Sequence, residues 1–228
     1  MKTKLHVLTE ISWQLDSASL LDKVHVEPGS EDADELLHLV QKARTLAKPK
    51  VLMAEAFVEA RTEDQIQING IRFSSRMLRQ QLSEVQRVFP FVASCGTELD
   101  SFSLPADDLL QKYWWEAIKE AVLANARRFF MEYLWLRFRV QKSSCMLPGA
   151  GAAGVWAIEE QTKLFALLGD VKKQIGVELT DSFLMLPHKS CSGIQYASAK
   201  DFRSCQVCQR ANCPGRSAVF VPELWDKC

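Results

Sequence analysis

Three cysteines near the C-terminal end of the chain have a spacing that suits metal chemistry. Cys205-Gln206-Val207-Cys208 is followed closely by Cys213-Pro214, and thiolates are soft ligands for iron and zinc. A proline directly after the last cysteine is typical of iron–sulfur ligation, whereas a structural zinc site usually has two pairs of ligands. The spacing therefore predicts an iron–sulfur cluster on Cys205, Cys208 and Cys213, with zinc and plain reduced cysteines as the alternatives.

A fourth metal ligand must come from another part of the chain. The residues that could fold back to supply it are Cys191, Cys145, Cys95, Cys228 and His188. Ligands need only be near in space, and we favour Cys191 as the fourth metal ligand. Each of these cysteines taken alone is more often a small core residue, because free cysteine is among the most buried residue types.

Arginines surround the three cysteines. Positive charge at Arg203, Arg210 and Arg216 would stabilise thiolates or bind an anionic group such as a phosphate or a carboxylate. A solvated basic rim is the alternative interpretation. The chain has neither a G-x-S-x-G nor an H-E-x-x-H motif, so ordinary hydrolase chemistry is not predicted.

A glycine-rich segment at residues 148–154 is the second place where a ligand could approach the backbone. Glycines let a backbone come close to a ligand, and the N-terminus of the helix expected from residue 158 would favour an anion. The segment matches neither a dinucleotide-binding G-x-G-x-x-G motif nor a phosphate-binding P-loop. It is either a ligand-binding loop or a mobile linker.

The overall composition excludes several classes of partner. The chain has 228 residues, seven cysteines, and 28 basic residues balanced by 28 acidic ones. The chain has no net positive charge that would attract nucleic acid or an anionic membrane. It also has no long apolar run that is free of charged residues. We expect a cytoplasmic protein with reduced thiols that binds neither nucleic acid nor membrane.

Local patterns predict a mixture of helices and strands. Helices are expected at residues 31–48, 75–86, 107–139 and 158–174, and strands at 51–59, 66–68, 71–73, 88–93, 183–186 and 194–197. The aromatic residues of the long central helix are assigned to packing (Trp114, Trp115, Phe129, Phe130, Trp135 and Phe138). We expect residues 1–100 to form an N-terminal α/β lobe and residues 101–228 to form the remaining region, which ends in the cysteine cluster.

The C-terminal half resembles a known domain family. Three stretches carry the likeness, at residues 156–169, 175–187 and 189–194, and it continues through the cysteine tail. These stretches are similar to the activation domain of vitamin B12-dependent methionine synthase, in a short stand-alone form. The resemblance implies an α+β fold, in which an antiparallel sheet is flanked by helices.

The resemblance also bears on cofactors. In the full-length enzyme this domain binds S-adenosylmethionine through a loop with an Arg, three further residues and Gly-Tyr. Cys145, Gly149 and Ala150 occupy the matching positions here, so the Arg and the Tyr are absent and S-adenosylmethionine binding is in doubt. Backbone binding of this ligand at residues 148–154 is the alternative. The residues expected to line a cofactor site are Pro148, Gly149, Gly151, Lys189 and Ser190.

The family likeness and the cysteine cluster together imply a redox role. We expect an accessory protein for a corrinoid-dependent methyl-transfer system, which activates a cobalamin protein by reduction or passes electrons to it through an iron–sulfur cluster. The expected partner is a corrinoid methyltransferase protein, which brings the cobalamin, or a folate-linked methyl-transfer enzyme. The alternative is a non-enzymatic docking module for a cobalamin protein, with structural zinc or no metal. Whether the chain has turnover of its own is left open.

Overall fold

The structure is a computed structural model that describes residues 3–151, 154–213 and 216–225. Its strands are β1 (Lys4–Leu8), β2 (Lys50–Arg61), β3 (Gln65–Ile68), β4 (Ile71–Ser74), β5 (Arg87–Ser94), β6 (Ser143–Met146), β7 (Glu178–Leu179), β8 (Met185–Leu186) and β9 (Ser190–Ala197). Its α-helices are α1 (Ser17–Lys23), α2 (Glu31–Leu46), α3 (Arg76–Gln81), α4 (Leu109–Phe138), α5 (Gln161–Leu168), α6 (Val171–Ile175) and α7 (Pro222–Trp225). Short 3₁₀ helices are η1 (Thr97–Ser101), η2 (Ile158–Glu160) and η3 (Ser204–Val207).

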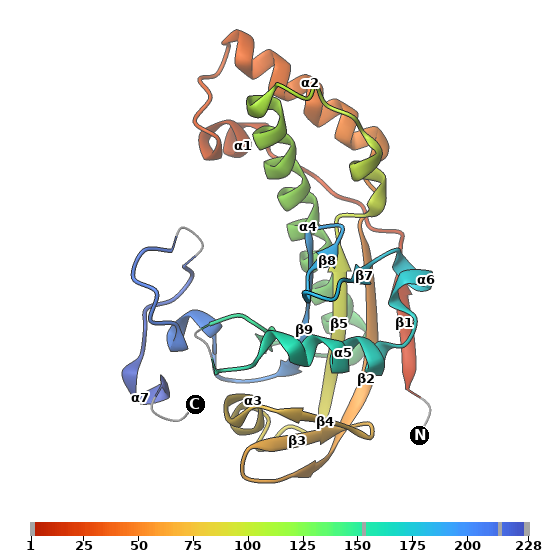
Figure 1. Ribbon diagram of the computed structural model, residues 1–228, viewed down its shortest axis with the longest axis vertical. Coiled ribbons are helices and arrows are strands. Elements are labelled where there is room, and N and C mark those ends of the chain that lie inside the picture. Colours follow the sequence, from red (N-terminus) through yellow and green to blue (C-terminus); the bar gives the residue numbers. More distant parts are fainter. Residues whose placement is uncertain (1–2, 152–153, 214–215, 226–228) are drawn as a thin grey trace.

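One antiparallel sheet of seven strands forms the centre of the molecule (Figure 1). The strand order is β4-β3-β2-β5-β9-β6, with β1 also paired to β2. The predicted fold class, an antiparallel sheet flanked by helices, is confirmed. The sheet takes strands from both sides of residue 100, and the predicted boundary between residues 1–100 and 101–228 stays a prediction.

The β3–β4 hairpin forms where alternating isoleucines flank an Asn-Gly pair. Asn69 and Gly70 both have positive φ angles, of 44° and 83°, as a type I′ turn requires. The side chains of Ile66 and Ile68, both on β3, are buried. The two strands predicted at residues 66–68 and 71–73 are therefore confirmed, and they pair as a hairpin.

Helices α2 and α4 begin at side chains that satisfy free backbone N–H groups. The Ser30 hydroxyl accepts from the backbone N–H of Ala33, and the Asp108 carboxylate accepts from that of Gln111. At its other end α4 stops at Arg139, which adopts a left-handed conformation. Both helices lie close to their predicted ranges, because capping residues and apolar periodicity agree at these positions.

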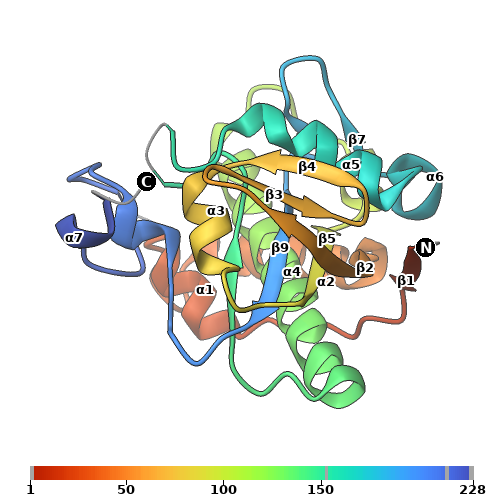
Figure 2. The ribbon, with the colours of Figure 1, turned by 90° about the horizontal axis from the view of Figure 1, so that it is seen from below.

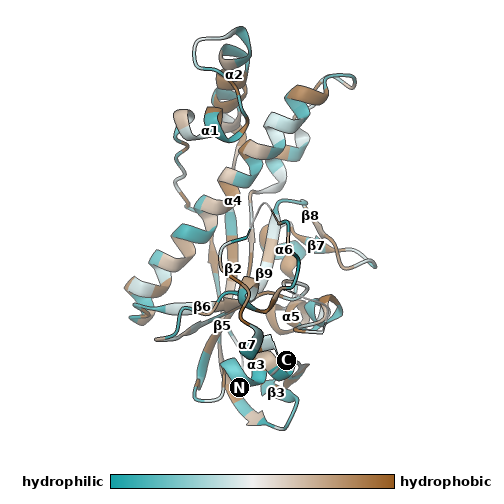
Figure 3. Ribbon diagram, turned by 90° about the vertical axis from the view of Figure 1, so that its left-hand side faces the viewer, coloured by the Kyte–Doolittle hydropathy of each residue, from teal (hydrophilic) through white to brown (hydrophobic). Residues whose placement is uncertain are grey.

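The sheet separates two of the three hydrophobic clusters. On one face the β2, β5 and β9 side chains pack with α3, α5 and α6, and on the other the C-terminal half of α4 covers the sheet through Phe130 and Leu134 (Figure 2). The N-terminal half of α4 extends past the sheet and packs with α1 and α2 through Trp114 and Ile118. We call this extension, made of α1, α2 and the first half of α4, the arm (Figure 3).

Three sequence predictions need correction. The single helix expected at residues 158–174 is interrupted, because Gly169 has a positive φ angle of 77° and Asp170 begins a new helix. Among the aromatic residues of α4, Trp135 is half exposed rather than packed, whereas Trp114, Trp115 and Phe130 are buried. The helix expected at residues 75–86 is also shorter, since α3 ends at Gln81.

None of the helices in the described part of the chain is long and apolar enough to cross a bilayer.

Candidate functional site

The segment that follows β9 returns along the outer edge of β6 and carries the three clustered cysteines. The Ser144 hydroxyl of β6 donates to the carbonyl of Lys200 at 2.7 Å and accepts from the backbone N–H of Phe202 at 3.2 Å. Phe202 and Val207 are buried in the same hydrophobic cluster as α5 and the sheet. We call residues 198–225 the tail, and these contacts hold its cysteine loop beside β6.

One guanidinium group holds the cysteine loop together. Arg216 donates to the carbonyl oxygens of Cys205 at 3.3 Å, of Cys208 at 3.1 Å and of Arg210. The backbone N–H of Cys208 also donates to the Cys205 carbonyl at 3.2 Å, which closes the turn between the two cysteines. The planar guanidinium can serve several carbonyls at once, so it fixes the backbone between Cys205 and Arg210.

The sulfur of Cys205 accepts two hydrogen bonds. The Ser217 backbone N–H lies 3.4 Å from Cys205 Sγ, and the Ser217 hydroxyl lies 3.5 Å from the same sulfur. These hydrogen bonds lower the pKa of Cys205, because both stabilise the thiolate. These hydrogen bonds therefore favour the negatively charged thiolate form of Cys205.

A cavity of about 660 Å³ lies between β6, α4 and the tail. Four thiols line it, from Cys145 on β6 and from Cys205, Cys208 and Cys213 of the tail. Three guanidinium side chains also line it: Arg127, Arg203 and Arg210. The three cysteines predicted as ligands thus share one cavity, which we call the thiol cavity. In the described ranges, no three His, Cys, Asp or Glu side chains are gathered closely enough to hold one metal ion.

A second cavity of about 460 Å³ adjoins the thiol cavity, and Leu147 and Ala150 line both. Pro148, Gly149 and Ser190, which were predicted to line a cofactor site, line this second cavity. The same cavity is lined by Cys191 and His188, so the favoured fourth ligand lies apart from the other three cysteines. We call it the glycine-loop cavity.

The remaining predicted residues lie elsewhere. Gly151 lines the thiol cavity rather than the glycine-loop cavity, and a side chain there would contact the Ser204 carbonyl of the tail. Lys189 lines neither cavity. Its ammonium group lies 3.7 Å from the Glu116 carboxylate of α4. Cys95 is fully buried beneath the arm, and burial raises its pKa to about 12. Cys228 lies outside the described residues.

Burial also raises the pKa values of the two cysteines that face the cavities from the sheet. The pKa of Cys145 is raised to about 12 and that of Cys191 to about 11, and the positive charge of Arg127 opposes both shifts. Both thiols are therefore protonated at neutral pH when no metal is bound. The two residues have similar partial exposure, so exposure alone does not distinguish them as ligands.

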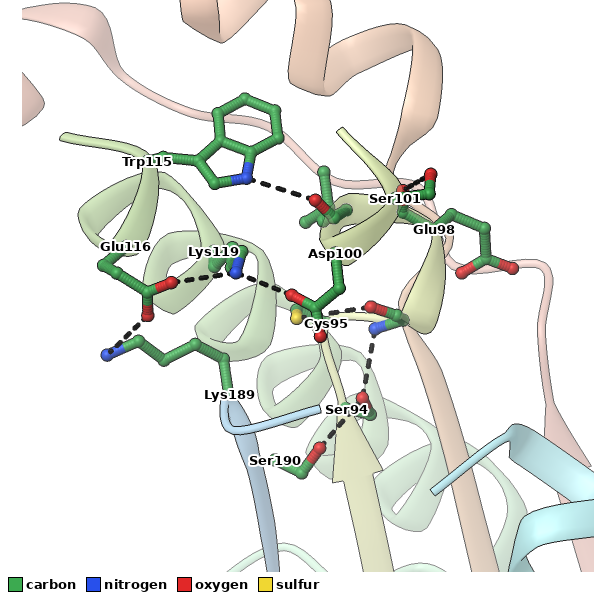
Figure 4. Close-up of polar contacts among 12 residues, drawn as sticks. Ser94, Cys95, Glu98, Asp100, Ser101, Trp115, Glu116, Lys119, Lys189 and Ser190 are labelled. Carbon is green, nitrogen blue, oxygen red and sulfur yellow. Dashed lines mark hydrogen bonds and ion pairs between the residues drawn. The ribbon is translucent and has the colours of Figure 1, made fainter. Parts of the chain in front are cut away.

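A polar network at the base of the arm was not predicted (Figure 4). Lys119 of α4 lies 2.6 Å from the Asp100 carboxylate and 2.8 Å from the Glu116 carboxylate, and Lys189, the residue before β9, approaches Glu116 as well. Burial lowers the pKa of Lys119, but its two carboxylate partners raise it by more. The only signal in the sequence was the spacing of Glu116 and Lys119, three residues apart on a helix.

Beside this network, two serines and a glycine link the end of β5 to the start of β9. The Ser190 hydroxyl donates to the Ser94 hydroxyl at 2.9 Å, and the latter accepts from the backbone N–H of Gly96 at 3.1 Å. Gly96 has a φ angle of 94°, and a Cβ atom there would lie 2.3 Å from the Lys48 carbonyl. Glycine is therefore required at this turn, which brings the start of η1 against α4.

An antiparallel sheet covered by helices on both faces, with a long helix that continues into an arm, defines the class of fold. A solved structure of this class is the MetH reactivation domain bound to AdoHcy, which is 16% identical in sequence, with a TM-score of 0.58. The match covers 88% of this chain and 81% of that chain. The likeness therefore extends over most of the fold.

Residues 139–210 match the family model of the vitamin B12 dependent methionine synthase activation domain. This range contains β6, both helices that follow the glycine-rich segment, β9 and the first two cysteines of the tail. The resemblance predicted from the sequence is confirmed over these residues. No curated protein sequence matches the chain.

Proposed function

We propose that this chain is an accessory protein of a corrinoid-dependent methyl-transfer system, which docks on a cobalamin-binding protein and takes part in its reductive activation. The match of residues 139–210 to the activation domain family carries the proposal. The similar fold of the MetH reactivation domain supports it. In this proposal the cobalamin is bound by the partner protein and not by this chain.

The thiol cavity gives the proposal its chemistry. An iron–sulfur cluster held there would supply one-electron transfer to the cobalt of the docked corrinoid, with a low-potential electron carrier as the donor. The chain itself holds the thiolates in place, through the hydrogen bonds of Ser217 and the carbonyl contacts of Arg216. The arginines that line the cavity favour a bound group with negative charge.

The test combines binding and reduction. The purified chain, prepared without oxygen, is mixed with a corrinoid protein in its cobalt(II) state and with titanium(III) citrate as a one-electron reductant. We expect the two proteins to co-purify and the visible spectrum to show faster formation of cobalt(I) than the reductant achieves alone. The variants C205S and C208S should still bind the corrinoid protein but lose this acceleration, whereas C95S should retain it.

Each result has a distinct meaning. Failure of the wild-type chain to bind any corrinoid protein would overturn the proposed function. Binding without faster reduction would leave a docking module in which the tail cysteines hold zinc or no metal. Faster reduction that persists in C205S and C208S would show that electrons do not pass through the tail.

S-adenosylmethionine binding is a separate question, because the similar solved domain was bound to AdoHcy. Cys145 and Ala150 occupy the positions where the family loop has its Arg and Tyr, and both line the thiol cavity. A thiol and a methyl group cannot replace a guanidinium that pairs with a carboxylate. We therefore expect calorimetry with S-adenosylmethionine or S-adenosylhomocysteine to detect no binding heat.

The double variant C145R/A150Y is the matched control for this titration. It restores both side chains of the family loop, so heat that appears only in the variant would support the assignment. Binding heat with the wild-type chain would contradict it and would favour recognition by the backbone of residues 148–154.

A further inference from the structure

Four of the seven cysteines converge on one cavity although they come from two distant segments. Cys205, Cys208 and Cys213 lie on the tail, and Cys145 faces the same cavity from β6. The tail is attached at this edge by the two hydrogen bonds of Ser144, the residue that precedes Cys145. The fold itself therefore brings the β6 cysteine to the tail cysteines.

We infer that Cys145 is the fourth ligand of an iron–sulfur cluster whose other ligands are Cys205, Cys208 and Cys213. The inference rests on the proposed function, because it names the ligands of the redox group that the function requires. It also replaces Cys191, the residue favoured from the sequence. Four cysteine thiolates are the usual ligand set for such clusters.

Cys191 packs against the same hydrophobic cluster as Cys145, but it lines a different cavity. It lies on β9 opposite Ala93, whereas Cys145 lies opposite Gln195, four residues further along the same strand. Cys191 lines the glycine-loop cavity, and Leu147 and Ala150 line both cavities and so lie at their boundary. A cluster bound by the tail would reach Cys145 within the thiol cavity.

The charge around the thiol cavity suits an anionic cluster. A cluster with four thiolate ligands carries net negative charge, and Arg127, Arg203 and Arg210 line the cavity. Arg203 is paired with Asp201, but the guanidinium of Arg127 has no ion-pair or hydrogen-bond partner among the described residues. Arg127 lies on α4, across the cavity from the tail, and its positive charge acts on Cys145.

Hydrogen bonds to sulfur are a second feature that suits a cluster. The Ser217 backbone N–H and hydroxyl both donate to Cys205 Sγ. Such bonds stabilise thiolate ligands and help to set the reduction potential of a cluster. Arg216 fixes the backbone of Cys205 and Cys208, so two of the four ligands are held in position before any metal arrives.

A cluster fits the thiol cavity better than a single zinc ion, because no three thiols in the described ranges are gathered closely enough for one metal ion. One zinc ion requires four sulfurs at about 2.3 Å from a common centre, so the thiols would have to draw closely together. A cluster presents its iron atoms at separate corners, and it can bridge thiols that surround a cavity without touching one another. The cavity of about 660 Å³ leaves room for a group of that kind.

The experiment measures iron and acid-labile sulfide in the full chain after anaerobic reconstitution and gel filtration. We expect iron and sulfide in equal amounts in the wild-type chain, and an electron paramagnetic resonance signal after reduction with dithionite. C145A should lose most of the iron, whereas the matched control C191A, a partly exposed cysteine on the neighbouring strand, should retain the wild-type content and signal. Circular dichroism of the metal-free variants checks that each is folded.

A nearly isosteric variant, C145S, answers the same question if C145A does not fold. A severalfold loss of iron in C145S, with C191S unchanged, supports the inference. Loss of iron in C191S with full retention in C145S overturns it, as does full retention in both. Bound zinc in place of iron overturns it as well. Binding of the corrinoid protein by the wild-type chain is measured separately, so failure of the proposed function is distinguished from failure of the ligand assignment.

Discussion

Arg216 acts on the cysteine loop through the shape of its guanidinium group as well as through its charge. It donates to three backbone carbonyls between Cys205 and Arg210. A lysine ammonium is a compact point charge and cannot reach the same set of carbonyls in one plane. The geometry of the loop therefore depends on this one side chain.

R216K tests this role at the level of a single residue. We expect hydrogen exchange of the Cys208 amide in the metal-free chain to accelerate about tenfold, equivalent to about 1.4 kcal/mol, with little change in the global unfolding midpoint. R44K is the control, because Arg44 is exposed on α2, which belongs to the arm. Equal exchange rates in R216K and the wild-type chain would show that Arg216 does not hold the loop.

The pH dependence of stability can be predicted for Cys95. Burial, assisted by the Asp100 carboxylate, raises its pKa from 9.0 to about 12. Between these pH values the unfolded thiol has lost its proton and the folded thiol has kept it, so unfolding becomes easier as pH rises. The stabilising contribution is fully present below pH 9 and is lost as pH rises toward 12.

Replacing Cys95 with Ala should therefore change the slope of stability against pH. Above the ordinary thiol pKa, the unfolding free energy of the wild-type chain should fall more steeply than that of C95A, by about 1.4 kcal/mol per pH unit. Urea unfolding at several pH values on both sides of that pKa measures the two slopes. Parallel slopes would show that Cys95 titrates normally in the folded chain.

At the scale of single residues, the spacing along the chain indicated that the three tail cysteines lie near one another, but it did not indicate that Cys145 lines the same cavity. Spacing along the chain reveals Cys205, Cys208 and Cys213, because these residues are near one another in any fold. The position of Cys145 beside them depends on the tail returning along β6, and no local pattern encodes that return. Ser217 and Arg127 could not be chosen for the same reason.

Among the secondary structure elements, the junction of α4 with η1 and β9 depends on Lys119. Its side chain is 12% exposed, and it holds the carboxylates of Asp100 and Glu116 together. Without the ammonium group the Asp100 carboxylate would lose its ion pair, and Glu116 would keep only the longer one to Lys189. The turn that contains η1 would then lose its main ionic attachment to α4.

K119M should reduce the unfolding free energy by about 1 to 3 kcal/mol, because it removes hydrogen bonds to two charged groups from a largely buried site. The control is K23M, since the Lys23–Glu120 ion pair is about half exposed on both sides. Exposed pairs contribute little, so the control should lose about 0.5 kcal/mol or less. Urea unfolding measures the loss of unfolding free energy in each variant. Similar losses in K119M and K23M would show that the Lys119 network does not stabilise the fold more than an exposed ion pair does.

The elements that could be predicted are those with strong local signals. Helices α2 and α4 have capping residues and long apolar periodicity, and the β3–β4 hairpin has its Asn-Gly turn. Strand β6 has only four residues and follows directly on α4, so it gave no readable pattern. The order of strands in the sheet depends on contacts between distant segments, which local patterns do not record.

For the whole molecule, the tail is part of the main core rather than an appendage. Phe202 is 6% exposed and packs in the hydrophobic cluster that also contains α5 and the face of the sheet. The cysteine loop is therefore joined to the fold through an apolar anchor as well as through Ser144. Unfolding of the tail and unfolding of the sheet should occur together.

F202A tests this coupling. We expect a loss of about 3 to 5 kcal/mol in the global unfolding free energy, as for other large side chains removed from a core. The matched control is V219A, because Val219 is 80% exposed on the same tail and should have almost no effect. Faster hydrogen exchange in the tail alone, with an unchanged global unfolding free energy, would show that the tail folds independently.

Strand β9 is the last strand of the sheet to be synthesised, yet it lies between β5 and β6. Until the ribosome has added Ala197, β5 lacks its second neighbour and β6 has no neighbour at all. The emerging chain therefore exposes unpaired strand edges through most of its synthesis, which favours association with other chains. The sheet can therefore be completed only after β9 has been made, and the cysteine tail can take its place beside β6 only after that.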